Sequence, residues 1–237
     1  MKSNRSIVLF PTTCSGRIAR RAACFVAVAL GLNATSIANA QVAPSGPVRA
    51  WGANWYGQIN VPSDLGPCKQ VAGGGNHTIA LTENSEVRAW GDNGNSQCAV
   101  PSDLGPCKQV AGGGYHTIAL TANGEVRAWG HNGYGQCTLP SDLGPCKQIA
   151  GGDIHTIALK ENGEVRAWGD NWAGQCTLPS DLGPCKQVAG GYYHTIALKE
   201  NGEVRAWGNN DYGQCTLPSD LGPSKIGEVR DDVSPET

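Results

Sequence analysis

The chain has 237 residues, of which 40% are hydrophobic and only 16% are charged. Its 33 glycines and 14 prolines argue against a helical bundle or a coiled coil and favour short strands joined by tight turns, while the apolar content argues against disorder. All 20 acidic residues but only 13 of the 18 basic residues lie after residue 40, so we do not expect this acidic part of the chain to bind nucleic acid.

Residues 1–40 have the pattern of a cleavable export signal. A basic stretch ends at Arg21, an apolar run occupies residues 22–32, and residues 38–40 read Ala-Asn-Ala, which is typical of a cleavage site. The apolar run is too short to span a bilayer, so we expect no membrane anchor. The pattern predicts that residues 41–237 form the mature domain and that this domain is secreted or periplasmic.

The mature domain is a repeat with a period of 39 residues. A tryptophan recurs at this step, at Trp51, Trp90, Trp129, Trp168 and Trp207, and a histidine keeps the same step at His77, His116, His155 and His194. The units begin near residues 48, 87, 126, 165 and 204, and the last unit is incomplete. One sequence is enough for this comparison because the chain aligns with itself.

Each unit contains three strand-like runs, represented in one unit by residues 109–113, 117–120 and 125–129. Asn123-Gly124 lies between the last two runs and predicts a tight hairpin. A three-stranded sheet cannot bury its own faces, so neighbouring units must stack on it. The sequence predicts an all-β, β-propeller-like array of about five small three-stranded blades, with a linear solenoid as the alternative.

The repeated motifs A-W-G-x-N-x-x-G-Q and V-A-G-G-x-x-H-T-I-A-L resemble the regulator of chromosome condensation repeat family. The short period most resembles the bacterial branch of that family typified by the type II β-lactamase inhibitory protein. The resemblance covers nearly all of residues 48–223 and implies a propeller. Four blades are complete in the sequence, and a fifth would have to combine the two termini. A five-bladed ring, an open arc and an oligomer are therefore all compatible with the sequence.

Eight cysteines of the mature domain form two series, one after Gly-Pro and one after Gln. Because export favours oxidation, we expect disulfides. Pairing at a step of 30 residues uses all eight and joins Cys68–Cys98, Cys107–Cys137, Cys146–Cys176 and Cys185–Cys215. The alternative joins Cys98–Cys107, Cys137–Cys146 and Cys176–Cys185, and leaves Cys68 and Cys215 to pair with each other. Neither series has the spacing of a metal site, and we expect no bound metal.

Residues that are identical in every unit are expected to build the scaffold. We interpret the five repeated tryptophans as packed between blades and the four histidines as donors or acceptors of a repeated hydrogen bond to a neighbouring loop. The alternative for the histidines is a ring of acid–base groups or ligands. We interpret the Asn and Gln of Asn-x-x-Gly-Gln as turn-forming residues.

Residues that vary between units are free to contact a partner. All eight other aromatic residues of the mature domain fall in two variable slots, just after each repeated tryptophan and just before each histidine. Exposed Tyr and Trp beside Asp and Asn are typical of protein-recognition surfaces. The predicted partner-binding residues are Trp55, Tyr56, Asn76, Asp92, Asn95, Tyr115, His131, Tyr134, Asp153, Ile154, Asp170, Trp172, Tyr192, Tyr193, Asp211 and Tyr212.

No nucleophile motif, paired-carboxylate motif or phosphate-binding loop is present in the mature sequence, so we expect a non-catalytic protein without a cofactor. The leading hypothesis is a secreted module that binds a protein through these loops. The resemblance implies that it inhibits an extracytoplasmic enzyme by occlusion. The alternatives are a glycan-binding propeller and, from the family name, a guanine-nucleotide exchange factor.

Overall fold

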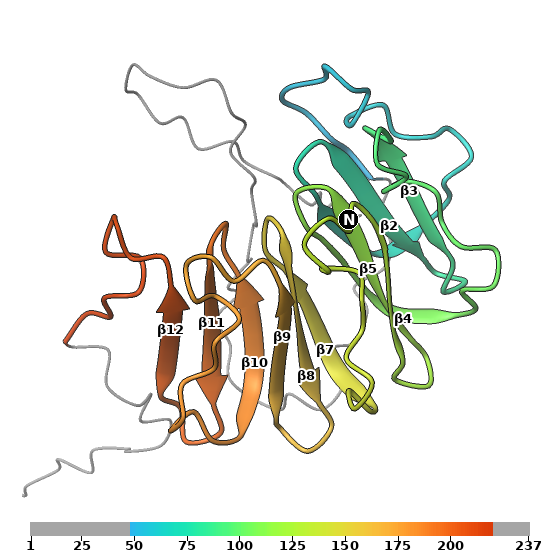
Figure 1. Ribbon diagram of the computed structural model, residues 1–237. Coiled ribbons are helices and arrows are strands. Elements are labelled where there is room, and N and C mark those ends of the chain that lie inside the picture. Colours follow the sequence, from blue (N-terminus) through green and yellow to red (C-terminus); the bar gives the residue numbers. More distant parts are fainter. Residues whose placement is uncertain (1–47, 220–237) are drawn as a thin grey trace, which may run out of the picture.

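The computed structural model describes residues 48–219 as twelve β-strands in four separate antiparallel sheets. Figure 1 shows the sheets following one another along the chain, from β2 and β3 on one side to β12 on the other. The strands are β1 (Cys68–Gly73), β2 (His77–Thr82), β3 (Val87–Gly91), β4 (Cys107–Gly112), β5 (His116–Thr121), β6 (Val126–Gly130), β7 (Cys146–Gly151), β8 (His155–Lys160), β9 (Val165–Gly169), β10 (Cys185–Gly190), β11 (His194–Lys199) and β12 (Val204–Gly208).

Each sheet is a meander in which the middle strand pairs with both of its neighbours. In the second sheet, His116 of β5 lies opposite Gly130 of β6, and Leu120 lies opposite Val126. The turn that joins these two strands contains Gly124 with a φ of +89°, a conformation that glycine adopts without strain. The Asn-Gly signal therefore marks a hairpin, as predicted.

The core lies between successive sheets, as expected for units that cannot bury their own faces. Ile79 and Leu81 of β2 are fully buried against Val110 and Trp129 of the second sheet. Equivalent residues form the contacts between the second and third sheets and between the third and fourth sheets. Each such contact buries several large apolar side chains, each worth about 1.5–3 kcal/mol, so the sheets stabilise one another.

The array is an open propeller. We call the first, second and third strands of each sheet the inner, middle and outer strands. The inner strands β1, β4, β7 and β10 contact one another in that order, and the described sheets do not close into a ring. The all-β, three-stranded architecture with a period of about 39 residues is thus confirmed, with four sheets in residues 48–219.

The fifth blade is not formed by the described residues. The segment that begins at Val48 repeats the sequence of β3, yet residues 48–52 are not a strand. Trp51 in this segment is 39% exposed, whereas the other four repeated tryptophans are 8–9% exposed. Trp129, Trp168 and Trp207 are covered by the preceding sheet, and Trp90 of the first sheet is covered by the segment before β1, which contributes Val48, Val61 and Leu65. The predicted packing between blades therefore holds for Trp129, Trp168 and Trp207, while Trp90 is buried without a preceding sheet and Trp51 is exposed. The predicted export signal and the end of the last unit lie outside the described residues.

Each linker between sheets is fixed to the outer strand of the sheet that follows it. Arg127 of β6 donates to both carboxylate oxygens of Asp103, with distances of 3.0 and 3.1 Å. The same pair recurs in the other units as Arg88–Asp64, Arg166–Asp142 and Arg205–Asp181. These exposed ion pairs add little stability individually, but they hold every linker in the same path. Within residues 48–219 there is no helix that is long and apolar enough to cross a membrane.

Candidate functional site: the aromatic loop end

The strand order brings both variable slots to the same end of every sheet. The inner strand ends where the middle strand begins, and the outer strand ends beside that point, so the loops after the first and third strands emerge together. We call this the loop end, and we call the other end, where the middle and outer strands are joined, the hairpin end. The inner loops are residues 74–76, 113–115, 152–154 and 191–193, and the outer loops are residues 53–58, 92–97, 131–136, 170–175 and 209–214.

A backbone hydrogen bond joins the two loops of each sheet. The amide of His131 donates to the carbonyl of Tyr115 at 2.9 Å, and Asp92–Asn76, Asp170–Ile154 and Asn209–Tyr193 repeat this contact. In the second sheet the rings also meet, because His131 lies 6.4 Å from Tyr115 and 6.2 Å from Tyr134 between ring centroids. The inner and outer slots thus form one continuous surface there.

Most of the predicted partner-contacting rings are exposed at this end. Tyr212 is 94% exposed, and Trp172 and Trp55 are 81% and 80% exposed. The other exposed rings at this end are Tyr56, Tyr115, Tyr134 and Tyr192. Tyr193 is half-buried, and its ring packs edge-on against that of Tyr192 at a centroid distance of 4.4 Å. Large exposed apolar side chains that gather on one part of a surface, unlike those scattered singly, are typical of interaction sites.

The predicted partner-binding residues other than Tyr and Trp differ in how deeply they are buried. The side chains of Asn76, Asp92, Asn95, His131, Ile154 and Asp170 are half-buried, and Asp211 is exposed. Asp153 is different, because it is only 6% exposed, and its predicted role as a surface contact is wrong. The pKa of the Tyr192 hydroxyl is raised by burial, by the charge of the Asp153 carboxylate and by a hydrogen bond to Asp153. Asp153 therefore helps to position the aromatic side chain of Tyr192.

The repeated Asn and Gln side chains shape the outer loops, as predicted. In the loop that contains Asn93, the side-chain oxygen of this residue accepts from the Cys98 amide at 2.8 Å. The Gln97 side-chain oxygen accepts from the Asn95 amide, also at 2.8 Å. Because the other outer loops repeat these bonds, the scaffold of each loop is constant while its exposed residues vary.

Three of the four repeated histidines, His77, His116 and His155, are buried and connect neighbouring sheets. His194 belongs to the last described sheet and is half-buried. Nε2 of His116 lies 2.9 Å from the Thr156 hydroxyl, and this hydroxyl donates to the carbonyl of Gln136 at 2.8 Å. Thr156 must therefore accept from His116, so Nε2 carries the proton. Burial lowers the pKa of His116 to about 3, which keeps the ring neutral. The predicted hydrogen bond to a neighbouring unit is confirmed, although its partner is a strand residue.

A second connection between sheets was not predicted from the sequence. The Gln109 side chain donates to the carbonyl of Ile149 at 3.0 Å and accepts from the amide of the same residue at 2.9 Å. Gln70 and Gln148 bond to the next sheet in the same way. The sequence shows only that Gln is identical in every Cys-Lys-Gln segment. This identity does not distinguish a glutamine that bonds to the next sheet from a glutamine that is exposed to solvent.

The eight cysteines of the described chain are free, and neither predicted pairing is present. The Gly-Pro cysteines begin the inner strands at the hairpin end, whereas the Gln cysteines follow the outer loops at the loop end. A sheet of five-residue strands separates these ends by about 15 Å, too far for a disulfide. Instead, the Cys98 thiol donates to the Asp92 carbonyl at 3.1 Å, and burial raises its pKa to about 11. Both alternatives failed because sequence spacing does not show at which end of a sheet a residue lies.

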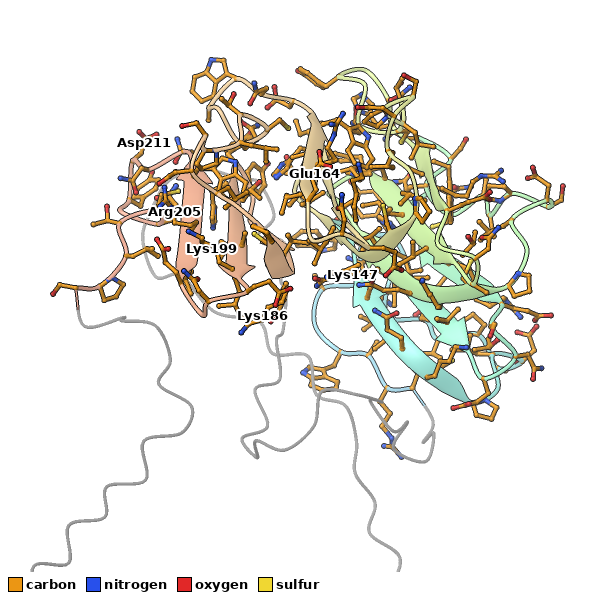
Figure 2. The ribbon with its side chains drawn as sticks, turned by 90° about the horizontal axis from the view of Figure 1, so that it is seen from below. Lys147, Glu164, Lys186, Lys199, Arg205 and Asp211 are labelled. Carbon is orange, nitrogen blue, oxygen red and sulfur yellow. The ribbon has the colours of Figure 1, made fainter. Side chains whose placement is uncertain are left out.

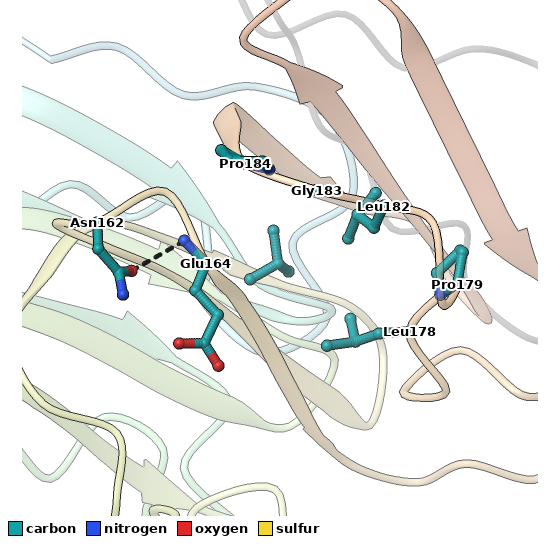
Figure 3. Close-up of a pocket in the computed structure, with 8 residues that line it drawn as sticks. Asn162, Glu164, Leu178, Pro179, Leu182, Gly183 and Pro184 are labelled. Carbon is teal, nitrogen blue, oxygen red and sulfur yellow. Dashed lines mark hydrogen bonds between the residues drawn. The ribbon is translucent and has the colours of Figure 1, made fainter.

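An apolar pocket lies away from the aromatic residues. It has a volume of about 300 Å³ and is formed by the β8–β9 turn and the linker that follows β9 (Figure 3). Leu178, Leu182 and Pro179 line it, and Glu164 borders it from the turn. Because this pocket is at the hairpin end, it does not form part of the aromatic surface.

The fold and the repeated loop end define an open RCC1-type propeller. The family model described as the Regulator of chromosome condensation (RCC1) repeat matches residues 68–97, 107–136, 146–175 and 185–214, which together make up just over half of the chain. The chain belongs to the RCC1 repeat family. No curated protein matches it.

Solved structures share the fold. Yeast RCC1 (Prp20), in a complex with Kap60, is 24% identical with a TM-score of 0.54, over 63% of this chain and 46% of that one. Human WBSCR16 is 23% identical with a TM-score of 0.59, over 70% and 58%. The ectodomain of the Physcomitrella patens receptor kinase CR4 is 23% identical with a TM-score of 0.57, over 67% and 46%. The chain therefore spans about half the length of these proteins.

Proposed function

We propose that this protein is a non-catalytic binding module whose loop end contacts a protein partner. The observation that carries the proposal is that exposed aromatic rings are concentrated at one end of a scaffold whose other residues repeat from unit to unit. Trp55, Trp172 and Tyr212 are all at least 80% exposed there. Tyr and Trp bury a large area on binding at a small cost in side-chain entropy, which makes them common anchors in protein interfaces.

The rigidity of the scaffold and the likeness to solved structures support this role. The histidine and glutamine connections hold successive sheets in register, so the loops are presented on a fixed frame. A fixed frame lowers the entropy that is lost on binding. A solved neighbour, yeast RCC1, is described in complex with the protein Kap60, and another structure of Prp20p is described together with its binding to Gsp1p and histones.

We further propose that the partner is extracytoplasmic and that binding occludes it. The basic, apolar and small-residue pattern of residues 1–40 supports export, and the resemblance to the type II β-lactamase inhibitory protein supports inhibition of an enzyme such as a β-lactamase or a cell-wall transpeptidase. Export would also separate the module from cytoplasmic GTPases, which disfavours the exchange-factor alternative. A glycan-binding propeller is the second candidate, because exposed Trp and Tyr rings also stack on sugars.

Affinity capture from native extracytoplasmic material tests the proposal. The bait is the mature chain, compared with a variant in which Trp55, Tyr134, Trp172 and Tyr212 are replaced by alanine. These four rings are each more than half exposed, so their removal should leave the fold intact. The matched control replaces four glutamates of the hairpin end with glutamine, at Glu83, Glu125, Glu161 and Glu200.

We expect a protein to be captured by the wild type and by the control but not by the aromatic variant. Equal recovery by all three baits would contradict the proposal. Binding of the wild type to a glycan array with no captured protein would favour the glycan-binding alternative.

A further inference from the structure

Charge is distributed unequally between the two ends of the sheets. The described inner and outer loops contain aspartates at positions 92, 153, 170 and 211 and no lysine or arginine. Apart from Arg49, which precedes β1 in a segment that is not a strand, every lysine and arginine of residues 48–219 lies on a strand; Figure 2 shows Lys186 and Asp211 at opposite ends of the fourth sheet. The loop end is therefore acidic as well as aromatic.

Many of the basic side chains near the hairpin end already have acidic partners. Lys147 lies 3.9 Å from Glu200, and Arg205 contacts Asp181 at 2.7 Å and Glu203 at 3.2 Å. The outer-loop aspartates bond instead to neutral donors. Asp170 accepts from the Gln175 side chain and Asp211 accepts from the Asn209 side chain, at 2.9 and 2.7 Å. Among the residues that the structure places, no cation forms an ion pair with these two carboxylates.

In two outer loops, a carboxylate and an exposed ring lie within one turn. The Trp172 amide donates to Asp170 at 3.3 Å, while the indole ring of this tryptophan is 81% exposed. Asp211 directly precedes Tyr212, whose ring is 94% exposed. A guanidinium group bonds to carboxylates through its edge and stacks on aromatic rings through its face, so a ring beside a carboxylate suits arginine better than any other side chain.

We propose that the outer loops at residues 170–175 and 209–214 bind arginine side chains of the protein partner. This inference rests on the proposed function and adds the chemistry of the partner segment. It places one arginine on Asp170 and Trp172 and another on Asp211 and Tyr212. Anionic partners such as nucleic acids, phosphorylated peptides and acidic glycans are disfavoured by the same carboxylates.

Peptide binding to the mature chain tests this inference. The probes are three capped, fluorescently labelled peptides with five repeats of Gly-Ser-Arg, Gly-Ser-Gln or Gly-Ser-Glu, and the readout is fluorescence anisotropy at 50 and 300 mM NaCl. The arginine peptide should bind at least tenfold more tightly than the glutamine peptide at low salt and should weaken at high salt. The glutamate peptide should bind least.

Two matched double variants locate the binding. The first variant combines Asp170→Asn with Asp211→Asn, and the second combines Trp172→Ala with Tyr212→Ala. Each variant should bind the arginine peptide at least fivefold more weakly than the wild type. Glu83→Gln with Glu125→Gln makes the same change in charge at the hairpin end and should alter binding less than twofold. Equal affinity for the arginine and glutamine peptides, or an equal loss in the control, would overturn the inference.

The capture experiment separates the two proposals. If the aromatic variant loses its captured partner while arginine gives no advantage, only the inference about arginine fails. If the aromatic variant keeps its partner, the proposed function itself fails.

Discussion

The imidazole Nε2 of His116 lies 2.9 Å from the hydroxyl oxygen of Thr156 in the next sheet. His77 and His155 make the same bond to Thr117 and Thr195. This repeated contact turns four separate sheets into one frame, and the frame determines where the variable loops lie.

Replacing His116 with alanine should destabilise the protein by about 2–4 kcal/mol. The change removes a buried hydrogen bond and leaves a cavity between two sheets. Urea unfolding followed by tryptophan fluorescence measures the effect. His131→Ala is the control, because His131 lies in an outer loop and its loss should change stability by less than about 1 kcal/mol. Similar effects of the two changes would argue against a structural role for the repeated histidine.

Stability should fall as the pH decreases from 6.5 towards 4. Burial lowers the pKa of His77 and His155 to about 4 and that of His116 to about 3. In this window the unfolded chain binds protons that the folded chain does not, so each histidine costs about 1.4 kcal/mol per pH unit until its folded pKa is reached.

Urea midpoints at pH 7, 6, 5 and 4.5 test this prediction. The depressed pKa values of carboxyl groups such as Asp181 and Glu203 act mainly below about pH 5, so they do not explain a loss of stability between pH 7 and 5. A midpoint that is constant from pH 7 to 5 would show that the buried histidines do not govern acid stability.

Gln109→Ala should cost about 2–3 kcal/mol, because it leaves the amide and carbonyl of Ile149 without their partner. Gln187 is the matched control. It occupies the same position in the last described sheet, and its side chain is exposed. Gln187→Ala should therefore change the free energy of unfolding by less than about 0.5 kcal/mol. Equal costs at the two positions would contradict the role assigned to Gln109.

Gly113→Ala should destabilise the chain by about 3 kcal/mol or more, because an added Cβ would overlap the His116 imidazole and the carbonyl oxygen of Gly152. The control is Gly94→Ala, where the new Cβ would meet only the end of the flexible Asp92 side chain. Thermal unfolding of the two variants distinguishes them. A Gly113 variant as stable as the Gly94 variant would mean that this glycine is not required by packing.

The repeat pattern made most of the fold predictable. The 39-residue period, the Asn-Gly hairpin and the buried tryptophans all follow from residues that recur, since recurrence within one chain reveals the scaffold directly. The sequence led to the hypothesis that both variable slots lie at the same end of each sheet. In the structure this follows because the middle strand pairs antiparallel with both the inner and the outer strand. The sequence did not show how deeply each loop residue is buried, so the buried Asp153 was grouped with the surface residues.

The cysteines show what a repeat pattern does not reveal. Cys68 and Cys98 recur with the same step, and their pairing used every cysteine, yet they lie at opposite ends of a sheet. Similarly, the role of Gln109 depends on the distance between two inner strands, which a linear sequence does not specify. Such relationships between units become visible only when the sheets are placed beside one another.

Hydroxyl-radical footprinting of residues 41–237, with and without a captured partner, tests the central claim most directly. The account predicts that Trp55, Tyr134, Trp172 and Tyr212 become protected together, while the exposed side chains of the hairpin end react as before. Protection of the hairpin end, with these four rings still fully reactive in the complex, would contradict it.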